Sequence, residues 1–167
     1  MESSYRFRTL SAMASFLFVV FLLQSSLLVL GYKLKDVEVM LEINGKPAEI
    51  FSARKIAQYD GSNPARPLYM GVKGVVFDVS KGKDFYGKGS AYNSLIGMDC
   101  SKAVAKMSLE EEDLTHDISD LSDDHLKALD DVFDGTYMAK YPVVGYMDFL
   151  KEQFPEKFVQ AAPKEDL

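Results

Sequence analysis

The chain has 167 residues, of which 47% are hydrophobic and 26% are charged, a composition that suits one globular domain. Its net charge of −6 at pH 7 excludes a strongly basic surface, so we do not expect nucleic acid as a partner. Cys100 is the only cysteine in the sequence, which excludes a disulfide within the chain.

Residues 1–31 have the pattern of a secretory signal peptide. Arg6 and Arg8 precede a mainly apolar run over residues 15–30, and small residues end this run near Gly31. We expect cleavage after Gly31. The alternative is retention as a membrane anchor, because the run approaches the about 20 residues that span a bilayer.

The next segment is expected to be an N-terminal extension over residues 32–47. Apolar residues alternate along 37–43 and precede Asn44-Gly45, which predicts an edge strand ending in a turn. The main domain is expected over residues 48–147, and a C-terminal tail over residues 148–167.

The main domain begins with a helix signal and a hairpin signal. Ser52 is placed to cap a short helix that ends at Asp60. Apolar runs over residues 68–72 and 75–79 flank Lys73-Gly74, which predicts a compact β-hairpin.

A glycine-rich loop follows the hairpin and carries Tyr86 and Tyr92, so two phenols are expected at the rim of the domain. A short helical turn should end at Gly97, and Asp99 is placed to cap a second helix. Three residues of that helix are expected to face inward: Ala103, Val104 and Met107.

The segment from Glu110 to Asp134 contains eleven acidic residues and one basic residue, Lys127. The acids lack the spacing and the central glycine of an EF-hand, so we interpret the segment as a solvated face rather than a calcium site. His116 and His125 lie within it, nine residues apart. They cannot complete a zinc site with one cysteine, and we expect both to be solvated.

Ser122 precedes a longer helix, predicted over residues 123–138, which Pro142 ends. One stripe of this helix should face the core: Leu126, Leu129, Val132, Phe133 and Tyr137. Lys140 and Tyr141 leave the helix end together. A last strand is predicted over residues 143–146, and a frayed tail over residues 151–167.

The elements together predict an α+β fold in which paired short helices cover a small sheet. A cleft between such helices is a common place for a flat cofactor. The sequence contains no nucleophile elbow, phosphate-binding loop or dinucleotide fingerprint, and we do not expect an enzyme.

Several motifs occur in order: Lys73-Gly74-Val75-Val76-Phe77-Asp78-Val79, Gly82, Phe85-Tyr86-Gly87, Tyr92, Lys106-Met107-Ser108-Leu109, Asp113-Leu114-Thr115-His116-Asp117, Ala139-Lys140-Tyr141-Pro142 and Val144-Gly145-Tyr146. Their combination resembles the membrane-associated progesterone receptor family over about residues 48–147. The resemblance implies a cytochrome b5-like fold that binds haem without the two axial histidines of cytochrome b5.

By this resemblance Tyr92 is the axial tyrosinate ligand of the haem iron, and Tyr86, Lys140 and Tyr141 line the pocket. A phenol whose ordinary pKa is about 10 binds as phenolate only beside a strong Lewis acid and a cation, here ferric iron and Lys140. A hard anionic ligand favours Fe(III). We therefore expect a ferric haem b that does not serve electron transfer.

The resemblance further implies a secreted, haem-dependent signalling protein with a cell-surface receptor and neurotrophic-type activity. A haem-mediated homodimer is one assembly open to it, because a single tyrosine ligand leaves the other axial position free and the exposed porphyrin is apolar. The first alternative is a membrane-anchored or endoplasmic-reticulum haem carrier that regulates haem monooxygenases and responds to steroids. The terminal Lys164-Glu165-Asp166-Leu167 resembles a retrieval signal for that compartment. The second alternative is a protein-binding domain that has lost haem.

Overall fold

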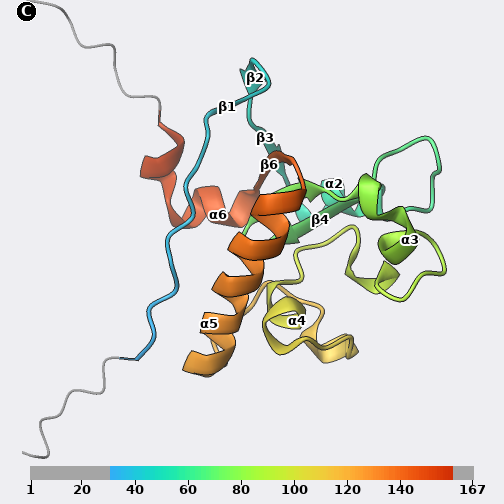
Figure 1. Ribbon diagram of the computed structural model, residues 1–167. Coiled ribbons are helices and arrows are strands. Elements are labelled where there is room, and N and C mark those ends of the chain that lie inside the picture. Colours follow the sequence, from blue (N-terminus) through green and yellow to red (C-terminus); the bar gives the residue numbers. More distant parts are fainter. Residues whose placement is uncertain (1–30, 160–167) are drawn as a thin grey trace, which may run out of the picture. The chain divides into compact units, whose positions relative to one another are not determined.

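The computed structural model describes residues 31–159, which form a four-stranded sheet, a separate two-stranded hairpin and short helices (Figure 1). The strands are β1 (Glu42–Ile43), β2 (Lys46–Pro47), β3 (Glu49–Phe51), β4 (Tyr69–Val72), β5 (Val75–Asp78) and β6 (Val143–Met147). The α-helices are α2 (Ala53–Ile56), α3 (Lys83–Tyr86), α4 (Ser101–Lys106), α5 (Asp123–Val132) and α6 (Asp148–Gln153). The α+β prediction is confirmed.

The larger sheet has the strand order β3-β6-β5-β4, with β3 parallel to β6 and the other pairs antiparallel. Both faces of β5 are buried, because Val75 and Phe77 join the main core while Val76 packs with Phe51 and Ile56 on the opposite face. This double burial explains why the strand is an unbroken apolar run.

The predicted hairpin is confirmed. Val72 pairs with Val75, and the turn residues Lys73 and Gly74 have φ angles of +53° and +75°. Two consecutive positive φ angles give the turn a twist that matches the paired strands, which is the geometry that two-residue hairpins favour. Lys73 is not a glycine, so its positive φ angle is strained. Its side chain is 3% exposed and pairs with Asp130.

The N-terminal segment differs from its prediction. Asn44 and Gly45 do form a turn, with φ angles of +53° and +72°, but only Glu42–Ile43 before it is a strand, and it pairs with Lys46–Pro47. Residues 32–40 run along the domain without a strand partner. Side-chain contacts hold them instead, since Val37 is buried in the main core.

The two longer helical predictions are largely confirmed. The Ser52 hydroxyl accepts a hydrogen bond from the backbone N–H of Lys55, and the helix extends as a 3₁₀ turn over Ala57–Tyr59. The Ser122 hydroxyl caps α5 in the same way at His125 N–H. After Val132 the helix continues as a π-helical turn, Phe133–Met138.

The prediction that Met107 faces inward is wrong. Met107 ends α4 in the left-handed conformation, with φ +49°, and its side chain is 86% exposed. Ala103 and Val104 are buried as predicted. One carboxylate oxygen of Asp99 accepts a hydrogen bond from Ser101 N–H in the first turn of α4. The other oxygen accepts one from Gly74 N–H, and this second bond ties α4 to the hairpin.

The frayed tail predicted from residue 151 is wrong up to residue 158. Helix α6 continues to Gln153, a 3₁₀ turn covers Pro155–Phe158, and Leu150 is buried in the main core. None of the helices within residues 31–159 is long and apolar enough to cross a membrane. The predicted signal or anchor segment and the terminal Lys164-Glu165-Asp166-Leu167 lie outside the described residues.

Candidate functional site

Two tyrosines come from the loop that follows β5. Helix α3 ends at Tyr86, and the loop then returns so that Tyr92 N–H donates a hydrogen bond to the carbonyl oxygen of Phe85 at 3.0 Å. The Asn93 side-chain amide also donates to Tyr86 O at 3.0 Å. These bonds close the loop, and the ring centroids of Tyr86 and Tyr92 lie 6.1 Å apart.

Two further tyrosines come from the end of the long helix. Tyr137 lies in the π-helical turn, and Tyr141 N–H donates to the carbonyl oxygen of Tyr137 at 3.0 Å. The Tyr141 ring lies 6.1 Å from that of Tyr86 and 6.2 Å from that of Tyr137. Tyr86, Tyr92, Tyr137 and Tyr141 are called the tyrosine cluster below.

The structure thus brings Tyr86, Tyr92 and Tyr141 together as predicted, although 49 residues of sequence separate Tyr92 from Tyr141. Sequence reasoning assigned Tyr137 to the core stripe and missed its place in the cluster. Its spacing of four residues from Tyr141 is the signal that could have found it, because such residues lie on one face of a helix. π-Helical turns are frequent at functional sites.

The four phenols of the cluster differ in how exposed they are. Tyr137 and Tyr86 are 5% and 7% exposed, Tyr141 is half-buried, and Tyr92 is 44% exposed. Burial raises the pKa of Tyr86 to about 12 and raises the pKa of Tyr137 well above its ordinary value. Burial therefore opposes ionisation of Tyr86 and Tyr137, and Tyr92 is the most exposed phenol of the cluster.

Gly82 makes the close packing of the cluster possible. A Cβ atom at this buried position would lie 2.9 Å from the Tyr141 hydroxyl oxygen and 2.9 Å from Cδ2 of Tyr86. Both distances are shorter than ordinary van der Waals contact, so any side chain at position 82 displaces the two rings. The glycine of the sequence motif is thus explained by side-chain packing.

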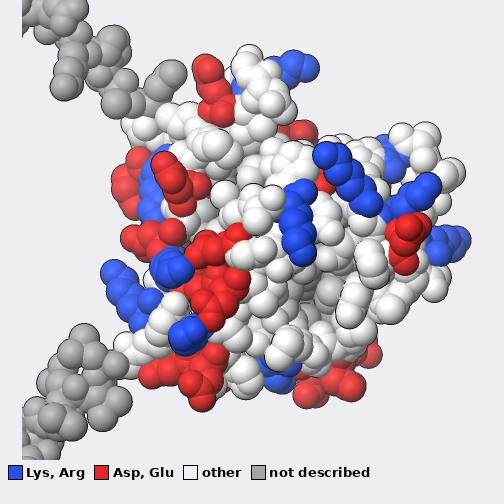
Figure 2. All heavy atoms as spheres, in the orientation of Figure 1, with Lys and Arg blue, Asp and Glu red and all other residues white. Residues whose placement is uncertain are grey.

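Basic side chains lie around the loop that carries the cluster. Lys81, Lys83 and Lys88 belong to α3 or flank it, and Lys140 directly precedes Tyr141. Figure 2 shows several basic residues on the side of the molecule where Figure 1 places α3, while the acidic residues concentrate over α5. This polarity favours an anionic ligand at the cluster. Lys140 is exposed, and its role as a pocket-lining cation stays a prediction.

The histidines do not join the cluster. His116 stacks on Phe149 at 4.4 Å between ring centroids, in a different part of the domain, and His125 lies in the first turn of α5. Within residues 31–159 there is no group of three or more His, Cys, Asp and Glu that could hold a metal ion. The four phenols of the cluster are oxygen donors, which fits an oxygen-ligated haem, and neither histidine is placed to ligate there.

The acidic segment is only partly the solvated face that was predicted. Asp113 and Asp130 are buried, with 1% and 0% exposed, and each pairs with a lysine. Lys106 Nζ lies 2.5 Å from Asp113, and Lys73 Nζ lies 2.5 Å from Asp130. Both lysines lie outside the acidic segment, and each neutralises the carboxylate that it pairs with. The local sequence of the segment therefore could not predict that these two acids are buried.

Comparisons with known proteins agree on the domain. The family described as “Cytochrome b5-like Heme/Steroid binding domain” matches residues 52–148. The chain is 42% identical over 95 residues to “Probable steroid-binding protein 3” of Arabidopsis thaliana, covering 57% of this chain and 94% of that protein. It is 37% identical over 97 residues to human “Membrane-associated progesterone receptor component 2”, covering 57% and 43%.

Solved structures give the same fold. An Arabidopsis thaliana protein described as having a cytochrome b5 like fold matches with a TM-score of 0.55 and 41% identity, covering 60% of this chain and 91% of that one. Other curated relatives are longer, and the chain spans between 35% and 50% of their length.

Proposed function

Because this chain belongs to the cytochrome b5-like heme/steroid binding family, we propose that its tyrosine cluster holds a haem whose iron is ligated by Tyr92. The single observation that carries the proposal is the difference in exposure within the cluster, in which one exposed phenol, Tyr92, stands beside two buried phenols whose ionisation burial opposes. An axial ligand must reach the iron as an anionic oxygen, and neutral neighbours can donate hydrogen bonds to it.

The other cluster residues have distinct roles in this proposal. Tyr86 stays protonated and can donate a hydrogen bond to an anionic oxygen, and the ring of Tyr141 packs against it. Lys140 supplies a positive charge beside Tyr141, and Lys81, Lys83 and Lys88 offer partners for haem propionates.

Bound haem would supply an Fe(III) centre with a hard anionic oxygen ligand. Such a ligand favours the oxidised state, so we infer a binding role without electron transfer. The fold shared with cytochrome b5 does not fix the function.

For the whole protein we propose a secreted signalling factor of the neudesin type, whose neurotrophic-type activity depends on bound haem and acts through a cell-surface receptor. The apolar run over residues 15–30 with its basic start supports entry into the secretory pathway. The alternative is a membrane-anchored or lumenal haem carrier that regulates haem monooxygenases and responds to steroids, and the names of several relatives favour it.

N-terminal sequencing of the protein made in a secretory host separates these two roles. A start near Tyr32 in the medium supports the secreted factor. Retention of residues 15–30 in a membrane fraction contradicts it and supports the anchored carrier. Protein that starts near Tyr32 but stays in the lumen assigns the terminal Lys164-Glu165-Asp166-Leu167 a retrieval role.

Haemin titration followed by absorption and EPR spectroscopy tests the site. Tyr92→Phe should weaken ferric haem binding at least about tenfold and remove the phenolate-to-iron charge-transfer absorption, because phenylalanine cannot ligate. The matched control is Tyr59→Phe, since Tyr59 is a half-buried tyrosine that stacks on Tyr69 outside the cluster. Unchanged haem binding in Tyr92→Phe, or an imidazole-ligated spectrum, would refute the ligand assignment.

A further inference from the structure

The turn between β1 and β2 places an asparagine directly before a glycine. Asn44 and Gly45 are both exposed, with φ angles of +53° and +72°, and nothing lies within 4 Å of a Cβ atom built on Gly45. The turn projects beyond β3 and β6 in Figure 1. The peptide bond between the two residues is therefore open to solvent, and Gly45 has no side chain to shield it.

This pair of residues can undergo a reaction that needs no enzyme. The Gly45 nitrogen attacks the side-chain carbonyl carbon of Asn44, and the new C–N bond closes a five-membered succinimide ring. The C–NH₂ bond breaks, and the amide leaves as ammonia with the proton from the Gly45 nitrogen. Water then breaks the bond from this nitrogen to the side-chain carbon, which leaves aspartate, or to the main-chain carbon, which leaves isoaspartate.

The hairpin around this turn is held by few contacts. Strands β1 and β2 pair with each other through Glu42 with Pro47 and Ile43 with Lys46, and within residues 31–159 no third strand joins them. An isolated two-stranded hairpin is marginally stable in water, and such segments open at little cost in free energy. The attack requires Asn44 to rotate out of its turn conformation, so this low cost keeps the reaction accessible in the folded protein.

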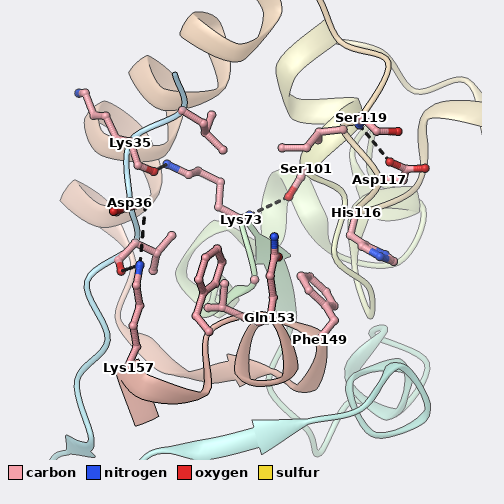
Figure 3. A pocket seen from close by; sticks show the side chains of 16 residues that line it. Lys35, Asp36, Lys73, Ser101, His116, Asp117, Ser119, Phe149, Gln153 and Lys157 are labelled. Atoms are coloured by element: carbon pink, nitrogen blue, oxygen red, sulfur yellow. Dashed lines mark hydrogen bonds and ion pairs between the residues drawn. The ribbon is translucent and has the colours of Figure 1, made fainter. Parts of the chain in front are cut away.

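The chain on either side of the hairpin is held firmly. Before it, Lys73 Nζ reaches the N-terminal segment and donates to the Lys35 carbonyl oxygen at 2.9 Å (Figure 3). At its base, Ala48 N–H donates to the Leu41 carbonyl oxygen at 2.8 Å. Opening is therefore confined to residues 42–47, and the main core keeps its packing.

The other two asparagines of the sequence are protected. Asn63 precedes Pro64, whose nitrogen carries no hydrogen to lose and so cannot close the ring. Asn93 is half-buried and is followed by a serine, and its side-chain amide donates to the Tyr86 carbonyl oxygen at 3.0 Å. Of the three asparagines, Asn44 alone combines a following glycine with an exposed turn.

Two aspartates also precede a glycine, but each is held in place. Asp60 accepts a hydrogen bond from Ser62 N–H at 2.8 Å and packs against Gly97, where an added Cβ atom would lie 2.9 Å from the Asp60 Cβ atom. Asp134 lies in the π-helical turn and pairs with Lys35 at 2.7 Å. A negatively charged carboxylate is also a poorer target for a nitrogen nucleophile than an amide.

We propose that Asn44-Gly45 is a site of spontaneous deamidation, at which the folded protein acquires aspartate or isoaspartate with age. The change adds a negative charge to a chain whose net charge is already −6 at pH 7. Isoaspartate also routes the main chain through the side-chain carbon, which lengthens the turn by one methylene group and breaks its match to the paired strands. Its free carboxyl group is the substrate of protein carboxyl methyltransferases that use S-adenosylmethionine. The proposal does not depend on haem binding.

Timed incubation of the purified protein in mildly alkaline buffer tests the proposal. The tryptic peptide of residues 36–54 carries Asn44 as its only side-chain amide, so mass spectrometry assigns the change from amide to acid directly. A synthetic peptide of the same residues is the unfolded reference. The protein should deamidate within about tenfold of the peptide rate, which corresponds to an opening cost below about 1.4 kcal/mol.

Variants and internal controls accompany this measurement. Asn44→Gln should stop the reaction in this peptide, because a six-membered ring closes far more slowly. Asn63→Gln, at another exposed asparagine, should leave the rate unchanged. An isoaspartyl carboxyl methyltransferase with labelled S-adenosylmethionine should label aged wild type at residue 44, and should not label aged Asn44→Gln.

Three results would overturn the proposal. The first is a protein rate more than about tenfold below the peptide rate, because the folded turn would then protect Asn44. The second is acid that appears first at Asn93, or methyl label at Asp60 or Asp134. The third is a loss of haemin affinity in step with deamidation, because opening confined to residues 42–47 should leave that affinity within about twofold. Failure of wild type to bind haemin at any age would overturn the haem assignment and leave the deamidation rates as the test of this inference.

Discussion

Replacing Asp130 with alanine removes the counter-ion of a buried ammonium group. The Lys73 and Asp130 side chains are 3% and 0% exposed, and Asp130 also accepts hydrogen bonds from Tyr32 and Lys35. Breaking a buried pair by removing one partner costs about 3–5 kcal/mol, because the remaining charge cannot regain its hydration. We expect Asp130→Ala to lower the free energy of unfolding by about this amount in urea titrations.

The chain supplies a matched control one residue along the helix. Lys127 and Asp131 form an ion pair at 2.7 Å in which both side chains are 61% exposed. Exposed pairs with this four-residue spacing contribute about 0.3–0.5 kcal/mol, so Asp131→Ala should change stability very little. The double variant Lys73→Met with Asp130→Leu should lose less stability than Asp130→Ala, because it leaves no uncompensated charge.

The same pair predicts a pH dependence. Burial alone would raise the pKa of Asp130, but the hydrogen bonds from Lys73, Lys35 N–H and Tyr32 outweigh it and hold this pKa below its ordinary value of 3.8. A lowered pKa stabilises the folded state above about pH 4, and this contribution is lost as the pH falls through the folded-state value. Acidification should therefore destabilise wild type more than Asp130→Ala. A loss below about 1 kcal/mol in Asp130→Ala, or equal acid sensitivity, would refute the reasoning.

A pair of glycine variants and a thiol reagent test the packing. Gly82→Ala should displace the rings of Tyr86 and Tyr141, which lowers haemin affinity about tenfold and the free energy of unfolding by about 1–3 kcal/mol. Gly135→Ala is the control: its Cβ would meet open space, so the free energy of unfolding should rise by about 0.5–1 kcal/mol. Equal effects of the two variants would contradict the packing argument. Cys100 is fully buried and burial raises the pKa of its thiol, so a disulfide reagent should modify it only in urea; rapid modification in buffer would show that α4 opens.

Local sequence signals account for the parts of the fold that were predicted correctly. The turn pair Lys73-Gly74 sits between two apolar runs, and Ser122 caps a helix with a clear apolar stripe, so neighbouring residues alone specify both elements. Tyr86, Tyr92 and Tyr141 were found because their motifs resemble a family, and their proximity could not be derived from spacing. Tertiary contacts between the loop and the helix end create that proximity.

Distant partners explain what the sequence could not reveal. Lys73 is buried because Asp130, which lies 57 residues further along the chain, neutralises its charge. No local sequence pattern predicts such a pair. Met107 points outward because α4 ends there in a left-handed conformation, although the helical spacing continues past it. Residues 151–158 were predicted as part of a frayed tail, because α6 is short and its packing on the core through Leu150 is not visible in the local sequence.

The packing between the tyrosine cluster and the buried Lys73–Asp130 pair bears on whether the two influence each other. A continuous path joins them: Lys73 Nζ lies 4.7 Å from the centroid of the Phe133 ring, Phe133 lies 5.8 Å from Phe77, and Phe77 lies 5.6 Å from Tyr137. Contact alone does not couple two sites, because coupling requires an element with two arrangements that both ligands bias. All four side chains of this path are buried, and Asp130 satisfies the charge at its start. Since no second arrangement of this path is seen in the described residues, we expect haem binding at the tyrosine cluster to leave the Lys73–Asp130 pair unchanged.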